Sequence, residues 1–179
     1  WSSDVCSSDL LISDTHGYLD PSVPDYFREC DEIWHAGDIG EKVADELRAL
    51  LPLRAVHGNI DDLKTRHEFP EDLIFDCCGQ KVLMTHIAGT PPRLNPRTKK
   101  LLQENRPDLL ICGHSHIARV MRLPESKSIN HQQVLYINPG AAGQQGFHRM
   151  RTIMRMEIID SKISVLEVIE LGKRGAPNY

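Results

Sequence analysis

The chain has 179 residues, a formal net charge of −4 with nine histidines counted as neutral, and a hydrophobic fraction of 40%. This length favours a single domain with a real core. The mildly acidic balance lacks the basic excess that is typical of proteins binding duplex nucleic acid. No apolar stretch is long enough to span a membrane, and residues 1–10 lack the basic start and apolar run of a signal peptide, so we expect a cytoplasmic protein.

Residues 1–9 are a poor lead-in to the apolar residues that follow. A strand that enters the interior of a parallel sheet should be almost continuously apolar. This segment instead resembles the reading-frame translation of a sequencing adapter, so we interpret it as non-native; the alternative is a natural polar tail. On the first interpretation Ser7, Ser8 and Asp9 occupy buried positions, at a cost of about 1–3 kcal/mol for each unsatisfied polar group.

From residue 10 onward, the first third of the chain alternates between strand-like and helix-like patterns. The apolar spacing in 41–51 predicts an amphipathic helix, which Pro52 ends. The expected elements are the end of a strand at 10–13, a short helical or turn segment at 21–30, a strand at 32–36, the helix at 41–51 and a strand at 53–57.

The remainder of the chain is mostly strand. Asn95 and Pro96 are typical of a helix start and predict a helix over 95–105. The expected strands are 73–77, 81–85, 109–112, 120–123, 134–137, 152–159 and 163–169, with a hairpin connection at 160–162. This order predicts an α/β fold of two packed mixed β-sheets flanked by helices, with one domain over 10–171 and a polar tail at 172–179.

Polar blocks follow five of the expected strands. Aspartate, histidine and asparagine hold hard or borderline divalent cations, and α/β proteins build their sites at the carboxyl ends of strands. The blocks therefore predict a site for two metal ions. Its candidate ligands are Asp14, His16, Asp38, Asn59, His86, His114 and His116.

These blocks, in this order, resemble the calcineurin-like metallophosphoesterases, and in particular their small YfcE-type phosphodiesterases. Asn138-Pro139-Gly140 matches a loop typical of the small members. The resemblance implies that one ion is held by Asp14, His16, Asp38 and His116, and the other by Asp38, Asn59, His86 and His114. It also implies that Asp38 bridges the two ions, and that Asp38, Asn59 and His114 belong to the catalytic centre.

The resemblance implies a metal-dependent phosphoesterase, and specifically a phosphodiesterase. Two cations would share a water and lower its pKa, so that a bridging hydroxide attacks phosphorus. The mixed oxygen and nitrogen ligands suit Mn²⁺, Ni²⁺, Co²⁺, Zn²⁺ and Fe²⁺, and availability often decides among them. Of these we expect Mn²⁺, with the other four as alternatives. The expected partner is a small phosphodiester, with nucleic acid only as a substrate, and a homodimer is compatible with this family. The natural substrate stays open.

One position departs from the pattern of many relatives. They carry a histidine after the Gly-Asn pair, which is thought to protonate the leaving group, whereas this chain has Ile60. The small members commonly lack this histidine too. His148, His57 and Asp61 are candidate substitutes, although Asp61 fits a supporting role better.

Two other interpretations of the ligand set remain. The retromer scaffold subunit shares the expected fold, so the chain could be a non-catalytic binding module. Alternatively the metals could be structural, although such sites usually hold one tetrahedral Zn²⁺ and are rich in cysteine. Arg93 and Arg97 could contact a substrate phosphate or lie on a solvated face.

Overall fold

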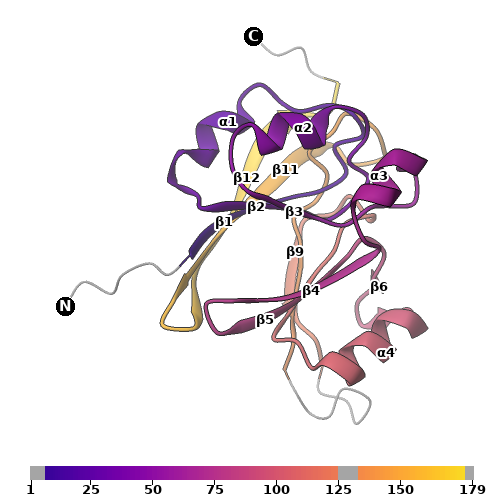
Figure 1. The fold of residues 1–179 in the computed structure, drawn as a ribbon, viewed down its shortest axis with the longest axis vertical. Helices are drawn as coiled ribbons and strands as arrows, with labels where there is room; N and C mark the ends of the chain where they lie inside the picture. The colour runs from indigo at the N-terminus through magenta and orange to yellow at the C-terminus, as the bar shows by residue number, and fades with distance from the viewer. Residues whose placement is uncertain (1–6, 125–132, 176–179) are drawn as a thin grey trace, which may run out of the picture.

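The computed structural model describes residues 7–124 and 133–175. Two five-stranded sheets face each other, and helices cover their outer sides (Figure 1). The first sheet has the order β12-β11-β1-β2-β3, and the second has the order β4-β5-β8-β10-β9. Both sheets mix parallel and antiparallel pairs, so the expected fold class is confirmed.

The strands of the first sheet are β1 (Ser7–Ile12), β2 (Glu32–His35), β3 (Leu53–Ala55), β11 (Met150–Ile159) and β12 (Lys162–Lys173). Those of the second are β4 (Asp72–Cys77), β5 (Gln80–Thr85), β8 (Leu109–Ile111), β9 (Arg119–Arg122) and β10 (Leu135–Asn138). A small hairpin is formed by β6 (Gly89–Thr90) and β7 (Arg93–Leu94).

Four α-helices and one 3₁₀ segment complete the described chain: α1 (Val23–Tyr26), η1 (Phe27–Glu29), α2 (Val43–Arg48), α3 (Leu63–Glu68) and α4 (Pro96–Asn105). In Figure 1, α1 and α2 lie over the outer face of the first sheet, whereas α4 lies at the far side of the second. In the described part of the chain, every helix falls short of the length and apolar character needed to cross a bilayer.

Three apolar clusters hold these layers together. Leu10 and Ile12 of β1 pack towards the helices of the first sheet, whereas Leu11 packs between the two sheets. A third cluster places Leu102 of α4 against the outer face of the second sheet. Because β1 is covered on both sides, it is the strand for which a continuous apolar sequence matters most.

The start of β1 is polar although it is buried. β1 begins at Ser7, so the last three residues of the segment interpreted as non-native belong to the sheet. Ser7, Ser8 and Asp9 are all buried, as expected for residues in these positions. Asp9 is fully buried, and its Oδ1 has no hydrogen-bond partner within 7–124 and 133–175.

Several expected elements have different bounds. The helix expected at 41–51 covers Val43–Arg48. It starts later than expected because Lys42 adopts a left-handed conformation with φ 68° and stands at the N-cap. The strand expected at 53–57 ends at Ala55, where pairing with β2 ends. β12 extends to Lys173, so the first residues of the expected polar tail lie in a strand. Residues 174–175 of the tail form a turn, and residues 176–179 lie outside the described part of the chain.

Local signals were accurate where they depended on one side chain. Asn95 caps α4, and its Oδ1 accepts a hydrogen bond from the Thr98 amide at 2.7 Å. Asp160 and Ser161 join β11 to β12, both with positive φ (49° and 59°). This two-residue connection in the left-handed region is the type that matches the twist of a hairpin.

Candidate metal centre

The candidate ligands lie on loops that follow parallel strands. β1 leads to Asp14, β2 to Asp38 and β3 to Asn59, while β5 leads to His86 and β8 to His114. β1, β2 and β3 are parallel neighbours, and so are β5 and β8. Their carboxyl ends therefore share one edge of each sheet, which is where open α/β sheets place ligands.

The backbone of these loops is held in an unfavourable conformation. φ is positive at Asp14 (53°), His16 (50°), Asp38 (53°), His114 (65°) and His116 (58°). Residues other than glycine seldom adopt this region. Each such residue costs about 1–3 kcal/mol, and these residues cluster at functional sites because the surrounding structure must hold them. The loops are thus fixed in conformations that the chain would not choose locally.

Asp14, His16 and His116 form the first of two groups. One candidate ligand atom from each lies within 4.8 Å of the others. Oδ1 of Asp14 lies 3.2 Å from Nε2 of His116 and 4.0 Å from Nε2 of His16. The two histidine Nε2 atoms face each other at 3.4 Å. Three electron-rich atoms therefore point at one small volume.

Asp38, His86 and His114 form the second group, with candidate ligand atoms again within 4.8 Å. Nδ1 of His86 lies 2.7 Å from the carbonyl oxygen of Ala36, which can only accept, so this nitrogen carries the proton. In neutral His86 the lone pair of Nε2 then faces Oδ2 of Asp38 at 3.1 Å and Oδ1 of Asp14 at 3.9 Å. The last contact joins the two groups.

Both groups fit cations. Oδ1 of Asp14 and Nε2 of His86 are buried and have no hydrogen-bond partner among the described residues. Burial alone would raise the pKa of Asp38 and lower the pKa of His86, but their direct interaction shifts the pKa of Asp38 down and that of His86 up. The space between them favours positive charge, which a proton or a metal cation can supply.

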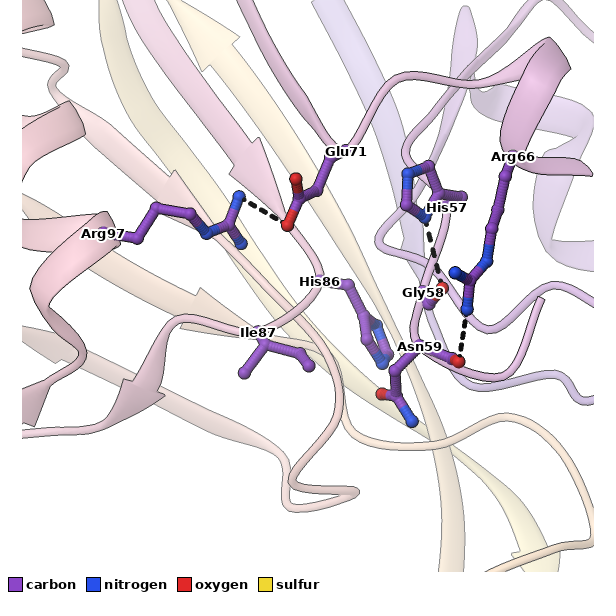
Figure 2. Close-up of a pocket in the computed structure, with 8 residues that line it drawn as sticks. All are labelled: His57, Gly58, Asn59, Arg66, Glu71, His86, Ile87 and Arg97. Atoms are coloured by element: carbon purple, nitrogen blue, oxygen red, sulfur yellow. Dashed lines mark hydrogen bonds and ion pairs between the residues drawn. The ribbon is translucent and has the colours of Figure 1, made fainter.

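Asn59 lies beside the second group. Figure 2 shows its side chain next to the His86 ring, at one side of a pocket of about 200 Å³. The pocket is lined by His57, Gly58, Asn59, Arg66, Glu71, His86, Ile87 and Arg97. A carboxamide at this place offers a neutral oxygen to a cation near His86.

Two glycines allow the loops to approach this closely. A Cβ at Gly58 would lie 2.0 Å from Oδ1 of Asp38. A Cβ at Gly113 would lie 1.9 Å from Oγ of Ser13 and 2.8 Å from Oδ2 of Asp14. Any side chain at either position would displace a carboxylate of the centre.

Asp61 and Arg66 tie the loops to one another. Asp61 is buried, and its two oxygens accept hydrogen bonds from the amides of Gly40 (2.9 Å) and Gly58 (2.7 Å). Arg66 of α3 donates to the carbonyl oxygens of Asp61 (2.8 Å) and Asn59 (2.6 Å). This pair connects the loop after β2 to the loop after β3. Sequence reasoning missed Arg66, because α3 itself was not expected.

Comparison with known families identifies the chain. The family model for the calcineurin-like phosphoesterase superfamily domain matches residues 10–161. The chain belongs to this superfamily. A curated relative from Methanothermobacter thermautotrophicus, named a probable metallophosphoesterase, is 30% identical over 140 residues, which cover 73% of this chain and 74% of the relative. The resemblance inferred from the sequence is thereby confirmed.

Solved structures share the fold of this phosphoesterase chain. A structure described as a novel archaeal phosphodiesterase superposes with a TM-score of 0.70 at 20% identity, covering 92% of this chain and 99% of that one. Zinc-bound Vps29 from Entamoeba histolytica gives a TM-score of 0.66 at 19% identity, with 92% and 98% covered. At these identities the likeness concerns the fold alone.

Ile60 stands where many phosphoesterases carry a histidine, and the structure shows how the three candidate substitutes, His148, His57 and Asp61, are engaged. Both oxygens of Asp61 and both ring nitrogens of His148 are engaged in hydrogen bonds. His57 lines the pocket in Figure 2 and uses only Nδ1, which lies 3.2 Å from the Gly58 carbonyl. Of the three, only His57 has a ring nitrogen without a hydrogen bond to any of the described residues.

Of the other polar residues considered in the sequence, some are paired or buried and others are exposed to solvent. Arg97 pairs with Glu71 at 2.9 Å and with Asp72 at 2.6 Å, so its charge is largely neutralised, whereas Arg93 is exposed. His35 is fully buried and bonded to Thr15 (2.9 Å), and burial lowers its pKa to about 4. It supports the loop as a neutral group. His67 is exposed, and His131 lies outside the described residues.

Proposed function

We propose that this phosphoesterase is a metal-dependent phosphodiesterase with a dinuclear centre. The observation that carries the proposal is the convergence of six candidate ligand side chains in two groups whose ligand atoms face one another. Nε2 of His86, whose proton is on Nδ1, and Oδ2 of Asp38 lie 3.1 Å apart, and two such electron-rich atoms repel unless positive charge lies between them. A buried arrangement of this kind is stable when cations occupy it.

The proposed ligand sets follow the two groups. Asp14, His16, Asp38 and His116 hold one ion, and Asp38, Asn59, His86 and His114 hold the other. Asp38 is proposed as the bridge because its carboxylate offers two oxygens. Its Oδ1 also accepts the Ile60 amide at 3.0 Å, which fixes the carboxylate plane. We propose Mn²⁺ as the first choice of ion, with Ni²⁺, Co²⁺, Zn²⁺ and Fe²⁺ as alternatives.

When bound, the two cations would lower the pKa of a shared water, so that its hydroxide attacks phosphorus, and would polarise the phosphoryl oxygens. The chain supplies the positioning. Asp38 is held by a hydrogen bond that its Oδ1 accepts from the Ile60 amide. Asn59 is held by a hydrogen bond that its carbonyl oxygen accepts from Arg66 of α3. His114 is the exposed member of the second group, so it could contact a bound substrate, which is the basis of its proposed catalytic role.

A small phosphodiester is the proposed substrate. The archaeal phosphodiesterase that shares the fold supports this choice over a monoester. The exposed Ile60 side chain donates no proton, so diesters with good leaving groups should react fastest. A nucleic-acid end also fits this class. The competing proposal is a scaffold, which the Vps29 likeness favours, although a scaffold needs no complete ligand set.

The test is hydrolysis of bis-p-nitrophenyl phosphate by metal-stripped protein, before and after addition of Mn²⁺, Ni²⁺, Co²⁺ or Zn²⁺. We expect turnover only with metal, and we expect His114→Ala to remove most of it. His67→Ala is the matched control, because His67 is exposed on α3 and lies outside both groups. No turnover with any of the four metals would favour the scaffold, and equal losses in the two variants would contradict the ligand assignment.

A further inference from the structure

His148 contacts His116 from the loop that precedes β11. Their Nδ1 atoms lie 3.3 Å apart, and their rings meet edge to face with centroids 5.2 Å apart. Nε2 of His148 lies 3.1 Å from the carbonyl oxygen of Gly143. A carbonyl oxygen only accepts, so Nε2 of His148 carries the proton and donates it there. The lone pair of His148 Nδ1 therefore faces His116.

This geometry assigns the proton of His116. The nitrogen opposite a lone pair must donate, so His116 carries its proton on Nδ1. Its Nε2 is then left as a lone pair, which faces Oδ1 of Asp14 at 3.2 Å and Nε2 of His16 at 3.4 Å. The chain of bonds thus runs from the Gly143 carbonyl through His148 to the atom of His116 that points into the centre.

We propose that His148 is a positioning residue that sets the tautomer and ring orientation of His116 for metal binding. This inference rests on the proposed metal centre. His148 is not itself a ligand, since both of its ring nitrogens are used. Partners of this kind raise the basicity of a metal-binding imidazole and are typically worth about 10–100-fold in metal affinity.

The loop that carries His148 is fastened on both sides of it. The amide of Gly143 donates to the carbonyl of Asp14 at 3.0 Å, which joins the loop to the backbone of another candidate ligand. Nε of Arg174, beyond the end of β12, donates to the His148 carbonyl at 2.9 Å. Gly146 has φ +115°, and a Cβ there would lie 2.0 Å from Nδ1 of His116. The loop is therefore shaped around the His116 ring.

Two substitutions of His148 distinguish the effect of its hydrogen-bond acceptor from the effect of the size of its ring. His148→Phe keeps a ring but removes the acceptor, whereas His148→Gln offers an oxygen that can accept from His116. The control is His67→Phe, the same change at an exposed histidine on α3. Each metal-stripped variant is titrated with Zn²⁺ by calorimetry, and its unfolding is followed without metal.

For the wild-type chain we expect two Zn²⁺ ions. In His148→Phe we expect one of them to bind about 10–100-fold more weakly and the other to keep its affinity. His148→Gln should stay within about threefold of the wild type, and His67→Phe should be unchanged. In the Zn²⁺-loaded wild type, the proton on His116 Nδ1 should give a slowly exchanging downfield NMR signal, and this signal should be absent in His148→Phe.

Failure of the inference and failure of the metal centre give different results. A wild-type chain that binds no Zn²⁺ would overturn the proposed centre. A wild-type chain with two ions and a His148→Phe variant with unchanged affinities would overturn only the role of His148. Equal weakening in the Phe and Gln variants would also overturn it, because the acceptor would then be irrelevant. If His148→Phe does not fold, absence of the His116 proton signal from the wild type would contradict the assignment.

Discussion

Two buried aspartates lie close together in the sequence, Asp9 in β1 and Asp14 in the loop that follows it. Burial is expected to destabilise the fold at Asp9 and to serve metal binding at Asp14. Asp9 and Asp14 are both fully buried. Oδ2 of Asp9 accepts a hydrogen bond from the Ser7 hydroxyl at 2.8 Å, and its Oδ1 has no hydrogen-bond partner in the part of the chain that the structure describes. Oδ2 of Asp14 accepts from the Ser13 hydroxyl at 2.8 Å and from the His114 amide at 3.0 Å.

The difference lies in what faces the free oxygen of each carboxylate. At Asp14, Oδ1 lies 3.2–4.0 Å from three imidazole nitrogens, so a cation placed there would be shared by strong ligands. At Asp9 the nearby charges include Glu32 and Asp31, and burial with these neighbours raises the pKa of Asp9 to about 7. A buried carboxylate is useful where its neighbours accept a cation and a liability where they do not.

The largest effect is expected from a change at Asp38, which belongs to the candidate metal centre together with Asp14. Asp38→Asn removes the bridging charge while it keeps the shape of the side chain. We expect activity to fall by at least about 1000-fold, which is beyond the range typical of supporting residues. Assay of bis-p-nitrophenyl phosphate hydrolysis checks this, and full activity in the variant would contradict the bridge.

In β1, the substitution Asp9→Leu should stabilise the fold. The pKa of Asp9 is about 7 in the folded chain, against 3.8 as its ordinary value. Between these pH values the unfolded chain loses its proton while the folded chain keeps it, so the free energy of unfolding decreases as pH rises. We expect Asp9→Leu to raise this free energy by on the order of 3 kcal/mol at pH 8 and by less at pH 4.

Urea denaturation of the wild type, Asp9→Leu and Asp9→Asn from pH 4 to 8 measures this effect. Asn keeps the size of the side chain and removes its titration, so the Asn variant should lose the contribution of Asp9 to the pH slope, even if it gains little stability. The opposite contribution of His35, whose pKa is lowered to about 4, should remain. A slope in Asp9→Asn equal to that of the wild type would show that another group causes it.

A change at Asp61 tests whether the loops after β2 and β3 need the hydrogen bonds that connect them through this carboxylate. Asp61→Ala frees the amides of Gly40 and Gly58, which then no longer hold the Asp38 and Asn59 loops together. We expect about a 10–100-fold loss of activity. Asp25→Ala, at an exposed pair on α1, is the control and should have no effect. Activity within twofold of the wild type in Asp61→Ala would show that the loops are held by other contacts.

The smallest effect is expected at Ile60, where a proton donor can be added. Ile60 is 56% exposed beside Asn59, so a ring can be placed there. Ile60→His should speed hydrolysis of diesters with poor leaving groups by about tenfold and change p-nitrophenyl diesters little, because general acid catalysis matters only for poor leaving groups. Ile60→Phe supplies a ring with no proton, and an equal gain in that variant would exclude proton donation.

The sequence was informative where a local pattern determines structure. Apolar runs followed by Asp or His marked the strand ends, and Asn95 marked a helix start, because each depends on neighbouring residues. The α3 helix was missed, although Asp62 caps it by accepting the Thr65 amide at 2.8 Å. It is short and has no buried residue, so no apolar spacing marked it.

The residues that hold the candidate ligands in place were harder to predict from the sequence than the ligands themselves. His148 and His116 are 32 residues apart, and their contact exists only because the loop before β11 returns to the end of β1. Arg66 holds Asn59 by a backbone carbonyl, a contact that leaves no pattern in the sequence. Residue types could suggest ligands, but the groups that orient the ligands depend on tertiary packing.

The most direct test of the central claim is a metal count on the same samples that are assayed. The wild-type chain, loaded with Mn²⁺ and freed of excess ion, should carry two ions per chain and hydrolyse bis-p-nitrophenyl phosphate, and Asp38→Asn should carry close to one. A wild-type chain that carries one ion or none after loading, or two ions that Asp38→Asn retains, would contradict a dinuclear centre built on that carboxylate.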